Sequence, residues 1–263
     1  MTRRVPISVF IIALDEADRI EKPIASVRDW ADEIIVIDSG STDGTQDLAR
    51  SMSDRVRVIF NPWPGYGLQK IFGERQCRNS WLLNLDADEE LDDELSAAIR
   101  RLFADGVPDC AGFALRRRMI HFSDDRPRRL APVTSYIRLY DKGRAGYRDS
   151  IVHDAVVVRE GAIEALAEGV INHRSFRSFE HFRAKLDEYA NWQARDMFER
   201  ARCPGNLRHR FEPVFAFAKH YLARRAFIYG RDGITMSLDY ARVRRNRLLR
   251  ARALFAENRA TGA

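Results

Sequence analysis

Apolar positions in the first hundred residues alternate between two periods. Residues 5–14 form a continuous apolar run, which is typical of a strand buried on both faces. Ile20, Ile24 and Val27 then recur at the spacing of a helix. The same alternation continues, with strands predicted at 33–37, 56–60 and 81–85 and helices at 45–52, 67–75 and, capped by Asp92, up to residue 103. This order predicts βαβ units and a parallel sheet whose strands end along one ligand-binding edge.

The pattern changes in the second half of the chain. Strand-like stretches at 112–122, 135–140 and 155–158 predict a smaller antiparallel section. From residue 179 the chain is predicted to be helical almost to its end, with a break at 203–206. We therefore expect an α/β domain over residues 1–175 and a helical, Arg-rich extension over 176–263.

Charge divides the chain in the same way. The net charge is +6, but residues 1–110 carry 13 Lys and Arg against 21 Asp and Glu, a balance of −8, which leaves +14 for the remainder. A basic tail suggests an anionic partner, either lipid or nucleic acid, although a solvated helix face has the same composition. Three widely separated cysteines build neither a zinc site nor a disulfide framework, which favours a reducing cytoplasm.

The segment after the strand at 81–85 carries the clearest chemical signal. Asp86 and Asp88 follow the strand directly, and alternate residues of an extended segment point to the same side. Clustered carboxylates are unfavourable unless a cation joins them, and Mg²⁺ or Mn²⁺ completed by phosphate oxygens and water suits such a pair. A solvated acidic helix start is the alternative, but it fits Asp86 poorly because this residue ends a buried strand.

A second signal follows the strand at 33–37. Asp38 is placed to accept a hydrogen bond from a base or a ribose hydroxyl, and Gly40 and Gly44 permit close approach of a ligand to the backbone. A tight turn alone would have a similar composition. The Gly-x-Gly-x-x-Gly fingerprint of a dinucleotide site is absent after the first strand.

Together these segments resemble family 2 glycosyltransferases of the GT-A fold, with a mostly parallel, Rossmann-like sheet. The resemblance is greatest to the bacterial branch that adds β-1,4-linked glucose to the inner core of lipopolysaccharide. It runs from about residue 7 to about residue 241 and is most specific in the first hundred residues. The matching segments are 30–43 (WADEIIVIDSGSTD), 63–70 (WPGYGLQK), 85–89 (LDADE), 138–140 (RLY) and 152–153 (VH).

The resemblance implies roles for the donor-binding residues. Asp38 is expected to contact the base or ribose of a nucleotide-diphosphate sugar, for which a UDP-hexose is the expected donor. Asp86 is expected near the ribose and in the metal site, and Asp88 as a metal ligand. Lys70 matches a basic position near the donor, where a cation supports the diphosphate as negative charge develops; a solvated helix lysine is the alternative. Asp15 and Ile71 depart from the asparagines of many relatives, which leaves donor preference open.

The family mechanism implies inversion by direct displacement. An acceptor hydroxyl attacks the anomeric carbon, the metal stabilises the leaving diphosphate, and a side chain removes the acceptor proton. Asp154 is the candidate base, although it stands where glutamate is common in relatives. His153 is a second catalytic candidate that would orient Asp154 or help at the metal, and a structural role is equally open for it. His173 is similarly ambiguous.

The C-terminal helices allow two interpretations. An apolar side with neighbouring arginines is typical of a helix lying in an anionic membrane interface, and it equally suits a helix packed on the catalytic domain. No stretch approaches the ~20 apolar residues of a membrane span. We expect a cytoplasmic enzyme, peripheral on the inner face of the bacterial inner membrane, that acts on a glycan or glycolipid acceptor. The apolar residues concerned are Phe211, Phe215, Ala218, Leu222 and Tyr229, and the arginines are Arg242, Arg244, Arg245, Arg247, Arg250 and Arg252.

Two other classes of protein share some of these sequence features with a glycosyltransferase. A sugar nucleotidyltransferase would share the α/β sheet and acidic metal ligands, but it opens with a Gly-rich, basic phosphate loop. The first strand is followed here by Ala13, Leu14, Asp15 and Glu16. A basic nucleic-acid-binding protein would account for the tail, but no recognition module is present and nucleic acid is not an expected partner.

Overall fold

The computed structural model describes residues 4–149, 155–205 and 207–261, and the chain forms two compact units. The first unit comprises residues 1–119 and 133–174, and the second comprises residues 120–132 and 175–263. Residues 120–132 are thus an excursion from the first unit that packs with the C-terminal helices. We call the two parts the α/β unit and the helical unit.

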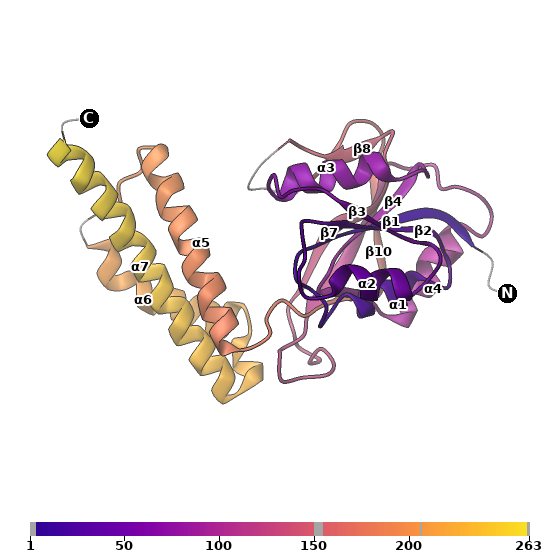
Figure 1. Ribbon diagram of the computed structural model, residues 1–263. Helices are drawn as coiled ribbons and strands as arrows, with labels where there is room; N and C mark the ends of the chain where they lie inside the picture. Colours follow the sequence, from indigo (N-terminus) through magenta and orange to yellow (C-terminus); the bar gives the residue numbers. More distant parts are fainter. Residues whose placement is uncertain (1–3, 150–154, 206, 262–263) are drawn as a thin grey trace. The chain divides into compact units, whose positions relative to one another are not determined.

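The α/β unit is built on one eight-stranded sheet with the order β3-β2-β1-β4-β7-β6-β10-β5 (Figure 1). Strands β1, β2, β3 and β4 are parallel, as are β6 and β10, whereas β7 runs antiparallel to both of its neighbours and β5 antiparallel to β10. The predicted mostly parallel sheet is confirmed. Its strands are β1 (Val5–Ala13), β2 (Ala31–Asp38), β3 (Val56–Phe60), β4 (Trp81–Asp86), β5 (Glu89–Leu91), β6 (Gly112–Met119), β7 (Val133–Asp141) and β10 (Ile163–His173).

The predicted antiparallel section takes two forms. Strands β6 and β7 extend the main sheet, because β7 pairs antiparallel between β4 and β6. Strands β8 (Ala145–Tyr147) and β9 (Val156–Val158) form a separate two-stranded antiparallel sheet. The hairpin that they make starts beside the centre of the large sheet, since Tyr147 belongs to the core around Phe10.

Helices cover both faces of the sheet because its central strands are apolar on both sides. Val9 and Ile11 of β1 contribute to one core, and Phe10 and Ile12 contribute to the other. Helices α1 (Glu21–Val27), α2 (Thr45–Ser51) and α4 (Asp93–Leu102) lie on the first face, and α3 (Tyr66–Gln76) lies on the second (Figure 1).

The sequence periodicity did not predict strands β5, β8 and β10. Strand β5 has only three residues, and β10 is largely polar with a shift of register between Leu166 and Ile171. Gly169 lies in that shift with φ +66°, where an added Cβ would stand 2.2 Å from the backbone nitrogen of Leu95. Asp92 closes this contact as the predicted helix cap, because its carboxylate accepts hydrogen bonds from the backbone N–H groups of Leu95 and Val170.

The helical unit consists of three helices and two short turns. Helix α7 (Arg231–Thr261) packs against both α5 (Phe179–Glu199) and α6 (Arg208–Ala218). A π-helical turn η1 (Lys219–Ala223) continues α6, and a 3₁₀ turn η2 (Ala226–Tyr229) leads into α7. The predicted break separates α5 from α6. Among the described residues, no helix is sufficiently long and apolar to cross a membrane.

Candidate active site

Two aspartates end the strands on either side of β1. In the sheet register, Ala13 is paired with Asp38 at the end of β2, and Ile12 is paired with Asp86 at the end of β4. The chain therefore delivers two carboxylates to the carboxyl edge of a parallel sheet, one on each side of its first strand. This is the position at which open α/β sheets bind ligands.

Asp38 is fully buried and organises the loop that follows β2. Its Oδ1 accepts hydrogen bonds from the backbone N–H groups of Gly40 and Ser41, both at 2.9 Å, and from Gln46 Nε2 at 2.7 Å. The Ser41 hydroxyl donates to its other oxygen. Asp15 links the neighbouring loop to this one, since its carboxylate accepts from the Thr42 N–H at 2.8 Å. The loops after β1 and β2 thus form one cross-linked rim.

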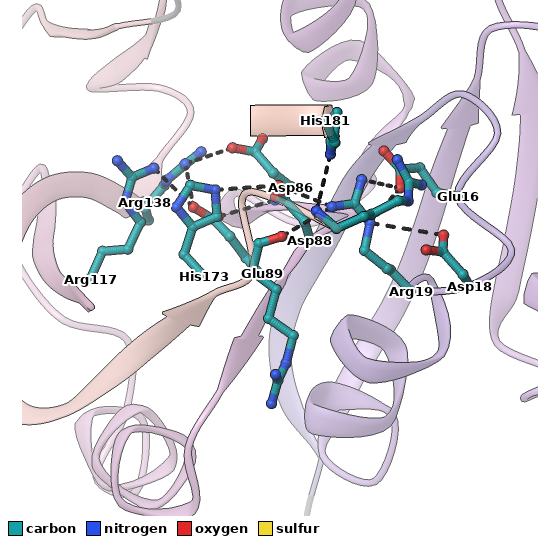
Figure 2. A network of polar contacts seen from close by, with 12 residues as sticks. Glu16, Asp18, Arg19, Asp86, Asp88, Glu89, Arg117, Arg138, His173 and His181 are labelled. Carbon is teal, nitrogen blue, oxygen red and sulfur yellow. Dashed lines mark hydrogen bonds and ion pairs between the residues drawn. The ribbon is translucent and has the colours of Figure 1, made fainter. Parts of the chain in front are cut away.

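Asp86 lies between two buried cations. Lys70 Nζ is 2.9 Å from its Oδ1. On the other side, Arg138 Nη2 is 2.9 Å from its Oδ2 (Figure 2). Lys70 is fully buried although it is a lysine on α3. Burial raises the pKa of Asp86, but the charges and hydrogen bonds of Arg138 and Lys70 lower it by a larger amount. The pKa of Asp86 therefore lies well below its usual value. Asp86 is therefore ionised throughout the physiological range.

Arg138 connects Asp86 to other buried polar groups. Its guanidinium donates to Asn84 and forms an ion pair with Glu89 at 3.0 Å. Tyr147 donates from its hydroxyl to the same Asn84 oxygen at 2.7 Å. Burial lowers the pKa of Arg138, yet the charges of Asp86 and Glu89 raise it well above its ordinary value. A nearly dry charge network therefore fixes the end of β4.

Asp88 reaches a different set of partners. The Nε2 of His173 is 3.3 Å from its Oδ2, and Arg19 Nη1 is 3.7 Å from the same oxygen. Burial raises the pKa of Asp88, but the hydrogen bond and charge of His173 lower it to a net value below the usual one. The pair forms because β5 follows Asp88 directly and runs antiparallel to β10, where His173 is paired with Glu89.

These two side chains also decide whether a divalent cation fits. The described ranges contain no group of three His, Cys, Asp or Glu residues that would hold a metal by themselves. Asp88 and His173 supply one carboxylate oxygen and one imidazole nitrogen, while Asp86 is already neutralised by Lys70 and Arg138. A Mg²⁺ or Mn²⁺ ion held by few protein ligands and completed by phosphate oxygens and water fits this donor set.

The sequence reasoning gains and loses residues at this site. Asp38 and Asp86 end neighbouring strands at one edge of the sheet and Asp88 follows closely, as their positions after the strands suggested, whereas Lys70 comes from α3 and meets Asp86 there. The two proposed catalytic residues, His153 and Asp154, lie outside the described residues. Sequence reasoning missed the part played by Arg138, Glu89 and Arg19, and it left His173 open, because their partners are distant in the chain. Only the segment at 138–140 carried a signal for Arg138, through the resemblance.

Comparisons with known proteins point to one family. Residues 8–164, more than half of the chain, match the family described as glycosyl transferase family 2. An uncharacterized glycosyltransferase of Rickettsia bellii is 39% identical over 94% of this chain and 86% of its own length. The lipopolysaccharide core biosynthesis glycosyltransferase LpsC of Rhizobium meliloti is 30% identical over 92% of this chain and 90% of its own.

A solved structure supports the fold. The mannosyltransferase PcManGT from Pyrobaculum calidifontis, in complex with GDP-Man and Mn²⁺, has a TM-score of 0.50 and 15% identity, with 98% of this chain and 80% of that chain covered. The predicted GT-A-like fold, with its mostly parallel sheet, small antiparallel sheet and C-terminal helices, is confirmed. On its sequence match over residues 8–164, the chain belongs to glycosyl transferase family 2.

Proposed function

We propose that the protein is an inverting, metal-dependent hexosyltransferase. It moves a sugar from a nucleotide-diphosphate donor, with a UDP-hexose as the first candidate, to a lipopolysaccharide-core or other cell-envelope glycan. The observation that carries this proposal is the pairing of Asp88 with His173 at the sheet edge, 3.3 Å apart, beside an Asp86 held ionised by two cations.

Asp88 and Asp86 are proposed to bind different parts of the donor. Asp88 and His173 are the residues that would hold a divalent cation, which when bound stabilises the charge on the departing diphosphate. Asp86 keeps both oxygens at the strand end and is suited to accept a hydrogen bond from a ribose hydroxyl. Because Lys70 is fully buried against Asp86, we propose that it acts through this carboxylate, by fixing its position and its charge.

Asp38 has a comparable role on the other side of β1. Its carboxylate holds the backbone of Gly40 and Ser41 in a fixed turn, and the same turn is tied to Asp15 through Thr42. A turn held in this way presents a preformed rim to the base and ribose of the donor. The cost of ordering the loop on donor binding is thereby reduced.

The acceptor proton requires a base. Asp154 remains the proposed general base and His153 its proposed helper. Support comes from strand β8, which precedes that segment in the chain. Its Tyr147 donates to Asn84 and carries Lys70 Nζ 5.3 Å above its ring. The described stem of the β8–β9 hairpin is therefore in contact with the Asp86 network.

The acceptor class rests on the relatives. LpsC is named for lipopolysaccharide core biosynthesis and matches this chain over most of its length. We propose a lipid-linked core glycan as the acceptor, and the inner face of the bacterial inner membrane as the place where the enzyme meets it.

A donor screen tests the proposal directly. The protein would be heated with UDP-, GDP-, dTDP- and ADP-sugars, with and without Mn²⁺, and the right donor should raise Tm because binding stabilises the folded state by mass action. Asp88→Ala should lose the Mn²⁺-dependent part of that shift. Asp93→Ala, an exposed carboxylate on the first turn of α4, serves as the matched control and should retain it. No shift with any donor in the wild-type protein would refute the proposed activity.

A further inference from the structure

Helix α6 presents large apolar side chains to solvent. Phe211 is 60% exposed, Val214 69% and Phe215 72%. Leu207 before the helix and Leu222 in η1 are each 62% exposed and recur at the same helical spacing. We call these five residues the outer face of α6.

The opposite side of α6 has the composition expected of a surface. Its buried residues are Glu212 and Ala216, and the carboxylate of Glu212 pairs with Arg244 of α7. A surface helix in a globular protein normally buries its apolar stripe and turns its charges to water. In α6 this arrangement is inverted, because a carboxylate is buried against α7 while the apolar side chains face solvent. Packing within the helical unit therefore does not explain why the outer face is apolar.

Basic residues surround the outer face. The segment 200–231 contains eight Lys or Arg residues and one acidic residue, Glu212, which is buried. Exposed cations therefore border an apolar strip without an exposed carboxylate between them. The basic residues of this border are Arg208, Arg210, Lys219, Arg224 and Arg225.

Several arginines of α7, among them Arg244, Arg247 and Arg250, have partners inside the helical unit. Arg247 Nη1 donates to Gln193 of α5 at 2.8 Å, and its guanidinium lies 3.6 Å from Glu212. Arg250 approaches Asp187 of α5 at 3.4 Å. These contacts join α7 to α5 and α6, so the guanidinium groups of Arg247 and Arg250 are engaged inside the helical unit.

We propose that the outer face of α6 is a docking surface for an anionic bilayer. Phe211, Val214 and Phe215 enter the acyl boundary, and the bordering arginines and lysine lie at the level of phosphate headgroups. The charge pattern selects this partner, because an apolar strip bordered by cations complements a surface that is apolar inside and anionic at its rim. This proposal rests on the proposed function, because the docking surface would hold the enzyme where a lipid-linked acceptor lies. Vesicle binding itself can be measured without any assumption about the enzyme's activity.

Vesicle flotation of the full-length protein tests the docking surface. Phosphatidylcholine vesicles with and without about 30 mol % phosphatidylglycerol would be used at low and high salt, because screening weakens surface electrostatics. Wild-type protein should float with the anionic vesicles at low salt. The double change Phe211→Ser/Phe215→Ser should reduce partitioning by about tenfold or more. Val107→Ser/Leu130→Ser, which changes two exposed apolar residues elsewhere, should leave it unchanged.

The charge component is tested separately. Arg210→Gln/Lys219→Gln should weaken vesicle binding on the order of tenfold at low salt. Arg28→Gln/Arg50→Gln removes the same charge from exposed positions of the α/β unit and should have a much smaller effect. Circular dichroism would confirm that each variant is folded.

Two results would overturn the docking proposal. One is failure of the wild-type protein to bind anionic vesicles at low salt. The other is binding that persists unchanged in Phe211→Ser/Phe215→Ser. A dimer in light scattering that these serines dissociate, without vesicle binding, would assign the outer face to a second copy of the chain. Donor-induced Tm shifts measured on the same samples report on the proposed function, so either idea can fail while the other stands.

Discussion

The two units of this protein use buried charge in different ways. In the α/β unit, Asp86 and Asp88 stand at the edge of a sheet, where Lys70 and Arg138 pair with Asp86 and Arg19 lies 3.7 Å from Asp88. In the helical unit, Glu212 is enclosed between α6 and α7, and its arginine partners join the helices. Buried charge is thus concentrated at the candidate site in the first unit, whereas in the second unit it joins helices to one another.

Apolar surface is distributed in the opposite sense. The central strands of the α/β unit bury almost all of their aliphatic side chains, whereas α6 leaves two phenylalanines exposed. The comparison teaches that a high content of arginine and phenylalanine does not indicate where either residue lies.

The largest expected effect belongs to the sheet edge. Asp88→Ala should reduce kcat on the order of 10³-fold or more, because charge stabilisation worth several kcal/mol is lost with the proposed metal ligand. The variant should still fold, because Asp88 lies outside both hydrophobic cores, with a modest fall in the free energy of unfolding because His173 and Arg19 lose their carboxylate partner. Initial rates with saturating donor and Mn²⁺, together with urea unfolding, would measure both. Most of the metal-dependent activity surviving would remove Asp88 from the metal site.

Asp154→Asn should lower kcat by about 10²-fold, as expected for loss of general-base catalysis. Donor affinity should be nearly unchanged, because the base acts on the acceptor. Titration with donor, followed by initial-rate measurements, separates the two quantities. If turnover is retained, the base is another group, and His153→Gln becomes the next variant to measure.

A charge removed from the helical unit should instead affect folding. Glu212→Ala leaves Arg244 and Arg247 without their shared carboxylate and should destabilise the unit by about 2 kcal/mol. Amide hydrogen exchange in α6 and α7 during urea titration would report this locally. Donor binding should remain as in the wild type. Glu199→Ala, which removes an exposed carboxylate at the end of α5, provides the control. An equal loss of unfolding free energy in both variants would contradict the proposal that Glu212 joins α6 to α7.

The smallest effect is expected at the rim. Asp38→Ala should raise the KM for donor about tenfold with little change in kcat, because loop order and a donor hydrogen bond serve ground and transition states alike. Asp38→Asn keeps one acceptor oxygen for the Gly40 and Ser41 N–H groups, so its KM for donor should lie between that of the wild type and that of Asp38→Ala. Steady-state kinetics at saturating acceptor would show it. An unchanged KM in a folded alanine variant would argue against the rim role.

The sequence by itself determined the parallel half of the sheet, the cap at Asp92 and the placement of Asp38, Asp86 and Asp88 at one edge. Each of these depends on local period or on the residue that directly follows a strand, and such information is contained in short segments. The resemblance of those segments also identified the family.

Only the tertiary structure decided which side chains meet. His173 joins Asp88 across 85 residues of sequence, through the antiparallel pairing of β10 with β5, and Arg138 joins Asp86 through the pairing of β7 with β4. It likewise decided that Arg244 and Arg250 of α7 pair with carboxylates while Phe211 and Phe215 of α6 stay exposed. Long-range register and helix packing set these outcomes, because a helical period states that two faces differ but not which face a neighbour will cover.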